Sequence, residues 1–513
     1  MKPGAASSYD RVLYHTLPRE QAHPNRLSML ARLFGLRTAP VERCRVLELG
    51  CGTGANLWPM AATLPESQFA GIDAAQRPIE IGSNAVTELG LKNLDLRVMD
   101  LREIGPEFGQ FDFILAHGVY AWVPEPVRDR LLSVCKRNLA PNGVAFVSYN
   151  TYPGGWLRRM VRDMMLYHTR LAEDPLERAG QGRALVEFLS ESLPDPDVYR
   201  AFLKQELEAI RKHGDWALVH DELNDDFEPV YFHQFAAHAA RHGLQYLSDS
   251  EFVEMQSGIF APHVAEALAQ LGGDLVAREQ YSDFLKCRKF RQTLLVHDGV
   301  PLRRETSAED VFAFYVCAGI RTEREPSLRS DAPEVFTAHE GKASITTNNP
   351  LAKAALWRLA RVFPRMLSFD ELVADVRAIL RPGAAHDGSP EDREGERKVR
   401  GALAEILLKT FAANLVEFHV WKPPYVTEVS ERPEAFPLAR WQAREGSQLT
   451  TLRHSSVRLE DPLTRALLLL LDGTRNHSRI VDEMALVAGT RLGLAERVEE
   501  NLHRAARAAL LVA

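Results

Sequence analysis

The stretch VLELGCGTG, residues 46–54, runs from the apolar pattern of a buried strand directly into three glycines at alternate positions. A helix-like pattern follows over residues 56–63. Glycines are needed at such a junction because the chain must turn sharply out of a sheet and let a ligand lie against bare backbone. Asp73 closes a second apolar strand pattern, residues 69–72, at the distance where a carboxylate binds ribose hydroxyls. Together these features predict a nucleoside cofactor.

The spacing of the glycines separates the candidate cofactors. A dinucleotide-binding loop has two residues between its second and third glycines, whereas this loop reads GxGxG and follows Glu48 inside the strand. The loop resembles motif I of the class I methyltransferases that use S-adenosyl-L-methionine (AdoMet). The resemblance implies that the loop packs against the methionine part of AdoMet, that Asp73 binds the ribose and that Asp100 lies beside the adenine amino group. The alternative is an unliganded glycine-rich turn in another α/β protein.

The order of the strand patterns predicts an α/β fold. Strands at 111–116 and 143–149 follow the third strand, and segments 244–248 and 290–297 are predicted to form the hairpin that closes a class I methyltransferase sheet. A helical insertion over 252–289 separates the two strands of that hairpin. The expected fold is therefore a Rossmann-like sheet with helical insertions, followed by a winged-helix-like α+β domain.

The C-terminal part of the chain changes composition after residue 301. Segment 381–398 is rich in Gly, Pro and charged residues, which predicts a linker or exposed loop, and two final helices are predicted after Pro462 and Ser478. The predicted domains are an N-terminal arm or lid (1–40), an AdoMet-binding methyltransferase domain (41–222), a methyltransferase regulatory region that completes the sheet (223–305) and a C-terminal winged-helix-like substrate-docking domain (306–513).

Composition bounds the class of protein. A chain of 513 residues with 45% hydrophobic and 26% charged residues is typical of a soluble protein with two or three domains. The formal net charge of −7 argues against general nucleic-acid binding. The longest apolar run, residues 466–471, is too short to span a membrane, and the N-terminus lacks the apolar core of a signal peptide, so we expect a cytoplasmic protein. The five cysteines are scattered and the 17 histidines show no HExxH or CxxH motif, so neither disulfides nor a metal are expected.

Five further strings extend the resemblance beyond motif I. They are YDRV with QAHPNRLSMLARLFGL before the glycine loop, AHGVYAWVPE after strand four, SYNTYPGGW after strand five, FRQTLLVH, and LLLLLDGTR. They are similar to bacterial methyltransferases that carry a methyltransferase regulatory domain and a winged-helix-like C-terminal domain. The best-described members of that family methylate lysines of outer-membrane proteins. The match is specific to about residue 296 and weakens in the C-terminal third, so the substrate stays open.

The candidate site residues follow from the strand ends and from this resemblance. Methyl transfer to an amine needs a positioned nucleophile and a dry pocket whose aromatic faces attract cations. Such side chains follow strands four and five, where open α/β sheets bind ligands, although core packing is the alternative for each aromatic residue. His117 could act as a base or donate a hydrogen bond, and His23 could be a lid residue or a turn residue. The predicted catalytic residues are His117, Tyr120, Tyr149 and Asn150, and the predicted cofactor-binding residues are His23, Glu48, Gly50, Gly52, Thr53, Asn56, Asp73, Asp100, Leu101 and His117.

Three functions remain open at this point. The first is an AdoMet-dependent protein N-methyltransferase that acts on lysine, with a protein or peptide as partner. The second is a methyltransferase that tailors a peptide or a small molecule. The third is a regulatory protein that binds AdoMet and uses its winged helix as an interaction module. Neither nucleic acid nor membrane insertion is expected, and a homodimer is one open alternative for the oligomeric state.

Overall fold

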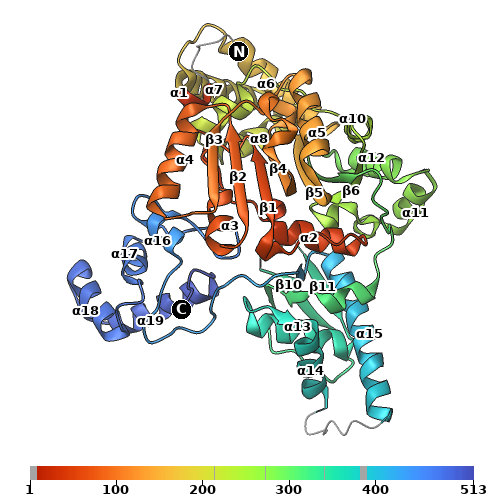
Figure 1. The fold of residues 1–513 in the computed structure, drawn as a ribbon, viewed down its shortest axis with the longest axis vertical. Coiled ribbons are helices and arrows are strands. Elements are labelled where there is room, and N and C mark those ends of the chain that lie inside the picture. The colour runs from red at the N-terminus through yellow and green to blue at the C-terminus, as the bar shows by residue number, and fades with distance from the viewer. Residues whose placement is uncertain (1–7, 213, 272, 340, 342, 382–389) are drawn as a thin grey trace.

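The centre of the molecule is a seven-stranded mixed sheet in the order β3-β2-β1-β4-β5-β7-β6 (Figure 1). The computed structural model describes residues 8–212, 214–271, 273–339, 341, 343–381 and 390–513. The strands are β1 (Arg45–Leu49), β2 (Gln68–Asp73), β3 (Leu94–Val98), β4 (Phe111–Ala116), β5 (Leu139–Asn150), β6 (Leu244–Asp249) and β7 (Phe290–His297). Strand β7 runs antiparallel to both β5 and β6, and the other neighbours are parallel. This arrangement confirms the predicted Rossmann-like methyltransferase sheet.

Both faces of the sheet are buried, which explains why its strands read as continuous apolar runs. Because side chains alternate across a strand, Val46 belongs to the core on one face and Leu47 to the core on the other. Helices α2 (Pro24–Leu33) and α3 (Leu57–Thr63) contribute to the first core. Helices α5 (Glu125–Asn138) and α10 (Phe232–Arg241) contribute to the second. The remaining helices beside the sheet are α4 (Gln76–Glu88), α11 (Pro262–Leu271) and α12 (Leu275–Lys286).

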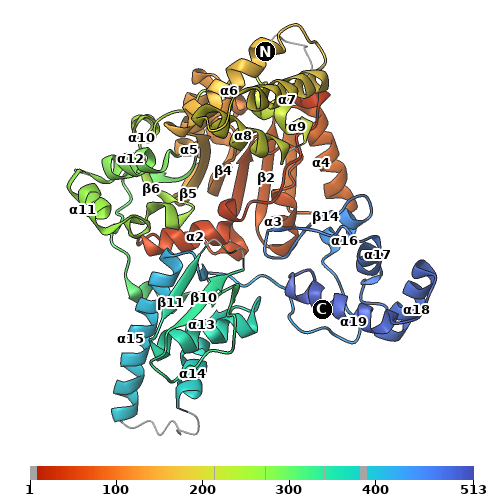
Figure 2. The same cartoon turned by 180° about the vertical axis from the view of Figure 1, so that it is seen from behind.

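A helical layer covers the end of the molecule where α1 (Ser8–Arg11) lies (Figures 1 and 2). It consists of α6 (Gly154–His168), α7 (Pro175–Ser192), α8 (Val198–Arg211) and α9 (Asp215–Ala217). Helices α6, α7 and α8 share a small apolar core against which Val12 of the N-terminal arm packs. The arm is thereby fixed between this layer and the sheet.

Residues 308–419 form a middle lobe on the other side of α2 (Figure 1). Its elements are β8 (Tyr315–Cys317), β9 (Ile320–Arg321), β10 (Glu334–Ala338), β11 (Ser344–Thr347), α13 (Pro350–Val362), β12 (Leu367–Ser368), α14 (Phe369–Leu380), α15 (Pro390–Ala412) and β13 (Glu417–His419). The prediction of a linker over 381–398 is wrong from Pro390 onward, where α15 begins, and residues 382–389 lie outside the described part. Ion pairs of Glu394 with Arg397 and Lys398, three and four residues on, stabilise this charged stretch as a helix.

Residues 431–510 form a C-terminal lobe that lies beside the middle lobe (Figures 1 and 2). It contains α16 (Pro437–Ala443), β14 (Gln448–Thr450), β15 (Ser456–Arg458), α17 (Pro462–Leu470), α18 (His477–Ala488) and α19 (Leu494–Arg507). The sequence predicted two final helices, but the structure has a third, α19, which starts after the left-handed residues Gly489 and Gly493. Among the described residues, no helix is both long and apolar enough to cross a membrane.

Candidate functional site

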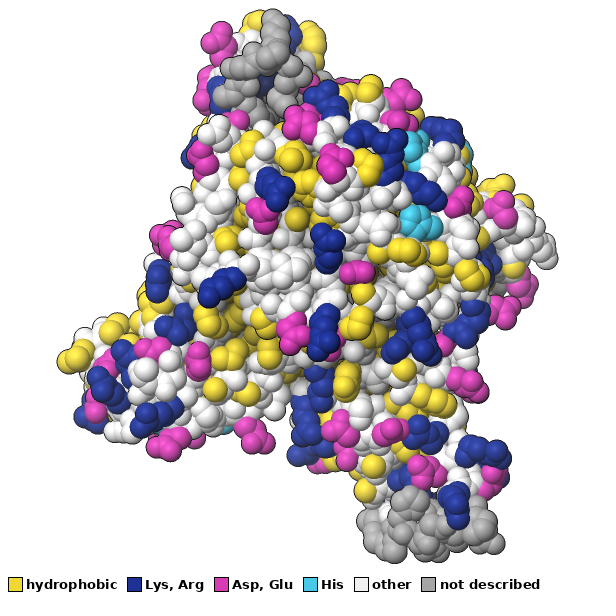
Figure 3. Space-filling model, viewed as in Figure 1, with side chains coloured by type: hydrophobic (Ala, Val, Ile, Leu, Met, Phe, Trp, Pro, Cys, Tyr) yellow, Lys and Arg dark blue, Asp and Glu magenta, His cyan; other side chains and the backbone are white. Residues whose placement is uncertain are grey.

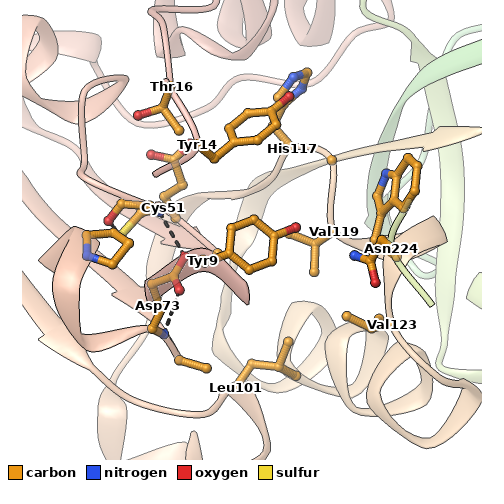
Figure 4. Close-up of a pocket in the computed structure, with 18 of the residues that line it drawn as sticks. Tyr9, Tyr14, Thr16, Cys51, Asp73, Leu101, His117, Val119, Val123 and Asn224 are labelled. Carbon is orange, nitrogen blue, oxygen red and sulfur yellow. Dashed lines mark hydrogen bonds between the residues drawn. The ribbon is translucent and has the colours of Figure 1, made fainter. Parts of the chain in front are cut away.

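A cavity of about 910 Å³ opens at the carboxyl ends of the central strands (Figure 4). Its walls come from the N-terminal arm, from the loops that follow β1 to β5, from residues 221–226 and from β7. Several predicted residues line it, namely Glu48, Gly50, Gly52, Asn56, Asp73, Asp100, Leu101, His117 and Asn150. The volume is in the range of small-molecule and cofactor sites.

The loop after β1 requires glycine at two positions for two separate reasons. Gly50 and Gly52 have φ angles of 70° and 57°, which side chains rarely adopt. A Cβ atom at Gly50 would lie 2.7 Å from Cγ2 of Val119, and one at Gly52 would lie 2.9 Å from Cγ2 of Thr16. The loop after β4 and the N-terminal arm can therefore close against bare backbone.

Asp73 is held rigidly at the end of β2 with both oxygens facing backbone donors. One carboxylate oxygen accepts the N–H of Gly52 at 2.9 Å and the other accepts the N–H of Ala75 at 2.9 Å. Burial raises the pKa of Asp73 above its usual range. Each oxygen keeps a second lone pair, so two vicinal hydroxyls could donate to this carboxylate without displacing the backbone.

Glu48 presents an unpartnered carboxylate oxygen to the cavity. Its Oε1 accepts Nδ2 of Asn56 at 2.9 Å, whereas Oε2 has no hydrogen-bond partner among the described residues. The side chain is only 4% exposed, and this burial raises the pKa of Glu48 to about 8. A buried carboxylate oxygen without a donor is costly, so the site fits a ligand that brings an ammonium group.

Asn56 is oriented from three sides. Its Oδ1 accepts the backbone N–H of Arg19 from the arm at 2.9 Å and lies 2.9 Å from Nε2 of His454. His454 belongs to the loop between β14 and β15 of the C-terminal lobe, 398 positions along the chain. The C-terminal lobe therefore reaches the carboxylate of Glu48 through a single intervening side chain.

Asp100 lies after β3 at the opposite end of the cavity. It caps the short turn at Leu101–Glu103 and accepts the guanidinium of Arg102 at 2.6 Å. This ion pair lowers the pKa of Asp100, which keeps the carboxylate ionised as an acceptor for an amino group. Leu101 lines the cavity next to it.

The arm closes the cavity with residues that sequence reasoning did not select. Tyr9 lies beside Asp73 in the close-up, with Tyr14 and Thr16 above the loop after β1 (Figure 4). His23, the residue predicted to cover the cofactor, lies elsewhere: its Nδ1 accepts the N–H of Asn25 at 3.1 Å and caps α2. The signal for the arm was the string YDRV, but nothing local showed which of its side chains turn inward.

Thr53 also lies outside the cavity lining. Its hydroxyl is 2.9 Å from the hydroxyl of Thr16, so it attaches the arm to the loop after β1. The contact positions Thr16, which does line the cavity.

The two predicted catalytic tyrosines do not line the cavity. The hydroxyl of Tyr149 lies 3.0 Å from Oγ1 of Thr293, and the hydroxyl of Tyr120 lies 2.7 Å from Nδ1 of His238. Alternation along β5 explains the first case, because Asn150 lines the cavity and its neighbour must face the opposite side of the sheet. Tyr149 and Tyr120 belong instead to the core formed with α10.

His117 is neutral at physiological pH. Burial, with the charge of Arg19, lowers the pKa of His117 to about 3, and its Nδ1 lies 3.0 Å from the hydroxyl of Ser148. A group with so low a pKa is a weak proton acceptor, so hydrogen bonding fits His117 better than base catalysis.

Asp221 is one of three acidic residues of the cavity lining, with Asp225 and Asp226, that sequence reasoning missed. It lies in a π-helical turn, Leu218–Glu222, beside Tyr14. Burial raises the pKa of Asp221 to about 6, partly offset by the charge of Arg158, and the pKa of Tyr14 rises to about 12. The cavity wall beside Tyr14 thus carries a carboxylate that can exchange a proton near neutral pH.

Comparisons with known proteins cover nearly all of the chain. A family model described as "Methyltransferase domain" matches residues 46–143, "Predicted methyltransferase regulatory domain" matches 215–297, and "PKMT, C-terminal winged helix domain" matches 431–510. Two solved structures of PKMT2 from Rickettsia typhi, one of them in complex with AdoHcy, are 26% identical to this chain. Their TM-scores are 0.86 and, for the AdoHcy complex, 0.87. Each match covers 98% of this chain and 100% of the PKMT2 chain. Protein RP789 of Rickettsia prowazekii is 32% identical over 504 residues, 97% of this chain and 87% of its own. The chain belongs to this methyltransferase family.

The protein is an AdoMet-dependent methyltransferase, and the cavity residues fit that cofactor. The free oxygen of Glu48 suits the ammonium of the methionine part, the acceptor lone pairs of Asp73 suit the ribose, and Asp100 suits the adenine amino group. These three carboxylates lie at the ends of the neighbouring strands β1, β2 and β3.

Proposed function

We propose that this methyltransferase transfers methyl groups to the side-chain amine of lysine in a protein substrate. The observation that carries the proposal is the second acidic wall of the cavity, where Asp221, Tyr14 and Asn150 lie beyond the residues that suit the cofactor. A carboxylate beside an aromatic ring attracts an ammonium group, as a lysine acceptor would present. The likeness of the whole chain to PKMT2 supports the same reaction.

The proposed chemistry needs little more than alignment and loss of a proton. When bound, AdoMet would supply an electrophilic methyl group on its sulfonium sulfur. The leaving group for in-line attack by an amine nitrogen would be a neutral thioether. Asp221 holds the incoming ammonium and takes its proton. Burial raises the pKa of Asp221 to about 6, which is closer to the pKa of an amine than the pKa of His117, about 3. His117 and Asn150 orient the nitrogen by hydrogen bonds, and the arm residues exclude water.

The test is transfer of label from tritiated AdoMet to a fractionated bacterial lysate, followed by mass spectrometry of labelled bands. We expect methyl-lysine in a protein band. Prior chemical acetylation of lysines in the lysate should abolish the label, and Asp221→Asn should lose it while keeping AdoMet affinity. Label confined to small molecules would support the tailoring function instead, and label in no fraction would support the regulatory function.

The role of the C-terminal lobe in substrate docking is part of the same proposal. Every residue that lines the cavity comes from positions 8–292, so neither the middle nor the C-terminal lobe supplies a described lining residue. The C-terminal lobe does expose large apolar side chains at Leu486 and Leu492, which are 85% and 90% exposed. The pair of substitutions Leu486→Asp and Leu492→Asp should raise KM for a protein acceptor and leave AdoMet affinity unchanged, whereas an unchanged KM would refute docking at this surface.

A further inference from the structure

Three side chains with metal-ligating atoms converge outside the cavity. His238 and His242 lie one turn apart at the end of α10, and Asp129 lies on the adjacent α5. Nε2 of His238 and Nε2 of His242 lie 3.4 Å and 2.9 Å from Oδ1 of Asp129. One ligand atom of each residue lies within 4.8 Å of the others. The i, i+4 spacing places both imidazoles on one face of the helix.

The distances suit a small transition-metal ion. Zinc binds imidazole nitrogen and carboxylate oxygen at about 2.0–2.2 Å, so the edges of a tetrahedral site are about 3.3 Å long. The contact of His238 with Asp129 already has this length, and the shorter contact of His242 must lengthen by a few tenths of an ångström. The Asp129 side chain is 60% exposed, so it can make that adjustment and leaves the fourth position open to solvent. Histidine side chains reach the surface in the region where Figure 1 places α10 (Figure 3).

The other ring nitrogen of His238, Nδ1, makes the kind of second hydrogen bond that metal-ligating histidines usually make. Its Nδ1 lies 2.7 Å from the hydroxyl of Tyr120, which can fix the tautomer whose Nε2 lone pair points toward Asp129.

We propose that Asp129, His238 and His242 form a binding site for a divalent transition-metal ion of the zinc type. Two imidazoles favour such an ion over magnesium or calcium, which prefer oxygen ligands. The site would join α10, inside the segment matched as the regulatory domain, to α5 of the methyltransferase domain. Through Tyr120 it would also be attached to the turn Tyr120–Trp122, which leads into the cavity wall. The proposal is independent of the identity of the methyl acceptor.

The test is titration of the chelator-treated, full-length protein with Co²⁺, whose visible absorption reports coordination, followed by displacement with Zn²⁺. We expect one equivalent of Co²⁺ per chain with the intense bands of a four-coordinate site, and a rise in melting temperature with zinc. His242→Ala and Asp129→Asn should each weaken binding by about tenfold or more, and Tyr120→Phe by at least several-fold through loss of the outer hydrogen bond.

His263→Ala provides the matched control, because His263 is an exposed histidine of the neighbouring α11 and should leave binding unchanged. Asp129 is exposed and Asn can keep its hydrogen bonds, so the fold of Asp129→Asn should persist in circular dichroism. Absence of stoichiometric Co²⁺ binding to the wild type would overturn the proposal, and so would full binding by both His242→Ala and Asp129→Asn. Either result would make the cluster a hydrogen-bond network only.

Discussion

Replacing Glu48 with Gln should weaken AdoMet binding and remove most of its dependence on pH. Burial raises the pKa of Glu48 to about 8, so the free protein carries a protonated Glu48 at lower pH. Binding of the cofactor ammonium needs the carboxylate, and affinity should then fall about tenfold for each pH unit below 8. Half of the Glu48 side chains are ionised at pH 8 and about one in a hundred at pH 6, so affinity falls about 50-fold between these values, or about 2.3 kcal/mol. Above pH 8 the α-amino group of AdoMet itself loses its proton, so wild-type affinity should be greatest near pH 8.

The same substitution should have the opposite effect on the stability of the ligand-free protein. The pKa of Glu48 is about 8 when folded and 4.5 in the reference state, so the folded form binds the extra proton between these values. Stability must then decrease as pH rises through this window, by on the order of 4 kcal/mol at pH 8. A neutral Gln avoids this loss. Glu48→Gln should therefore match the wild type near pH 4.5 and exceed its melting temperature at pH 8.

Calorimetry of AdoMet binding at pH 6, 7 and 8, with thermal melts of both proteins across pH 4.5 to 8, measures the two effects. Asn56 keeps an acceptor in the variant, because the Gln oxygen can receive the hydrogen bond that Glu48 Oε1 now accepts at 2.9 Å. Equal melting temperatures at every pH, together with an unchanged binding profile in Glu48→Gln, would refute both the raised pKa and the placement of the ammonium at Glu48.

Three further predictions concern other parts of the site. Asp73→Ala should weaken AdoMet binding by about 1.5–3 kcal/mol in calorimetry through loss of charged hydrogen bonds to the ribose, and unchanged affinity in the folded variant would move the site. Tyr149→Phe should cost about 1 kcal/mol in unfolding free energy through its bond to Thr293, with a single-turnover rate within about twofold of the wild type; a tenfold slower rate would return this hydroxyl to the chemistry. His454→Phe should weaken AdoMet binding by roughly two- to tenfold, because Asn56 Oδ1 loses one of its hydrogen-bond donors. Wild-type affinity in this variant would show that the contact contributes nothing to AdoMet binding.

Three carboxylates of the cavity lining could be predicted from the sequence because they lie at strand ends. Glu48, Asp73 and Asp100 each close or flank a short apolar run, and the parallel order of the strands brings those ends together. The alternation of side chains along β5 could also have excluded Tyr149 from the cavity, although the aromatic residues of that segment favoured the opposite prediction. Tyr149 and Asn150 are adjacent in β5, so only one of the two can face the cavity.

Other parts of the cavity wall were less accessible because they depend on contacts between distant segments. Asp221 reaches the cavity wall from a turn between helical elements, where no periodic pattern marks a site. The metal-ligating cluster was missed for a related reason. His238 and His242 have a helical spacing that surface histidines often share, and their third ligand, Asp129, is more than 100 positions away.

The contact of His454 with Asn56 limits how the chain can be divided or recombined. Consider a hybrid protein in which residues 431–510 come from a relative. The exchange changes the surface of the C-terminal lobe, and it also replaces His454, which donates a hydrogen bond to Asn56. Altered turnover in such a hybrid would then mix two causes, a new acceptor preference and a loosened Asn56. Retaining histidine at position 454 in the donor segment separates the two causes, because Asn56 then keeps this donor.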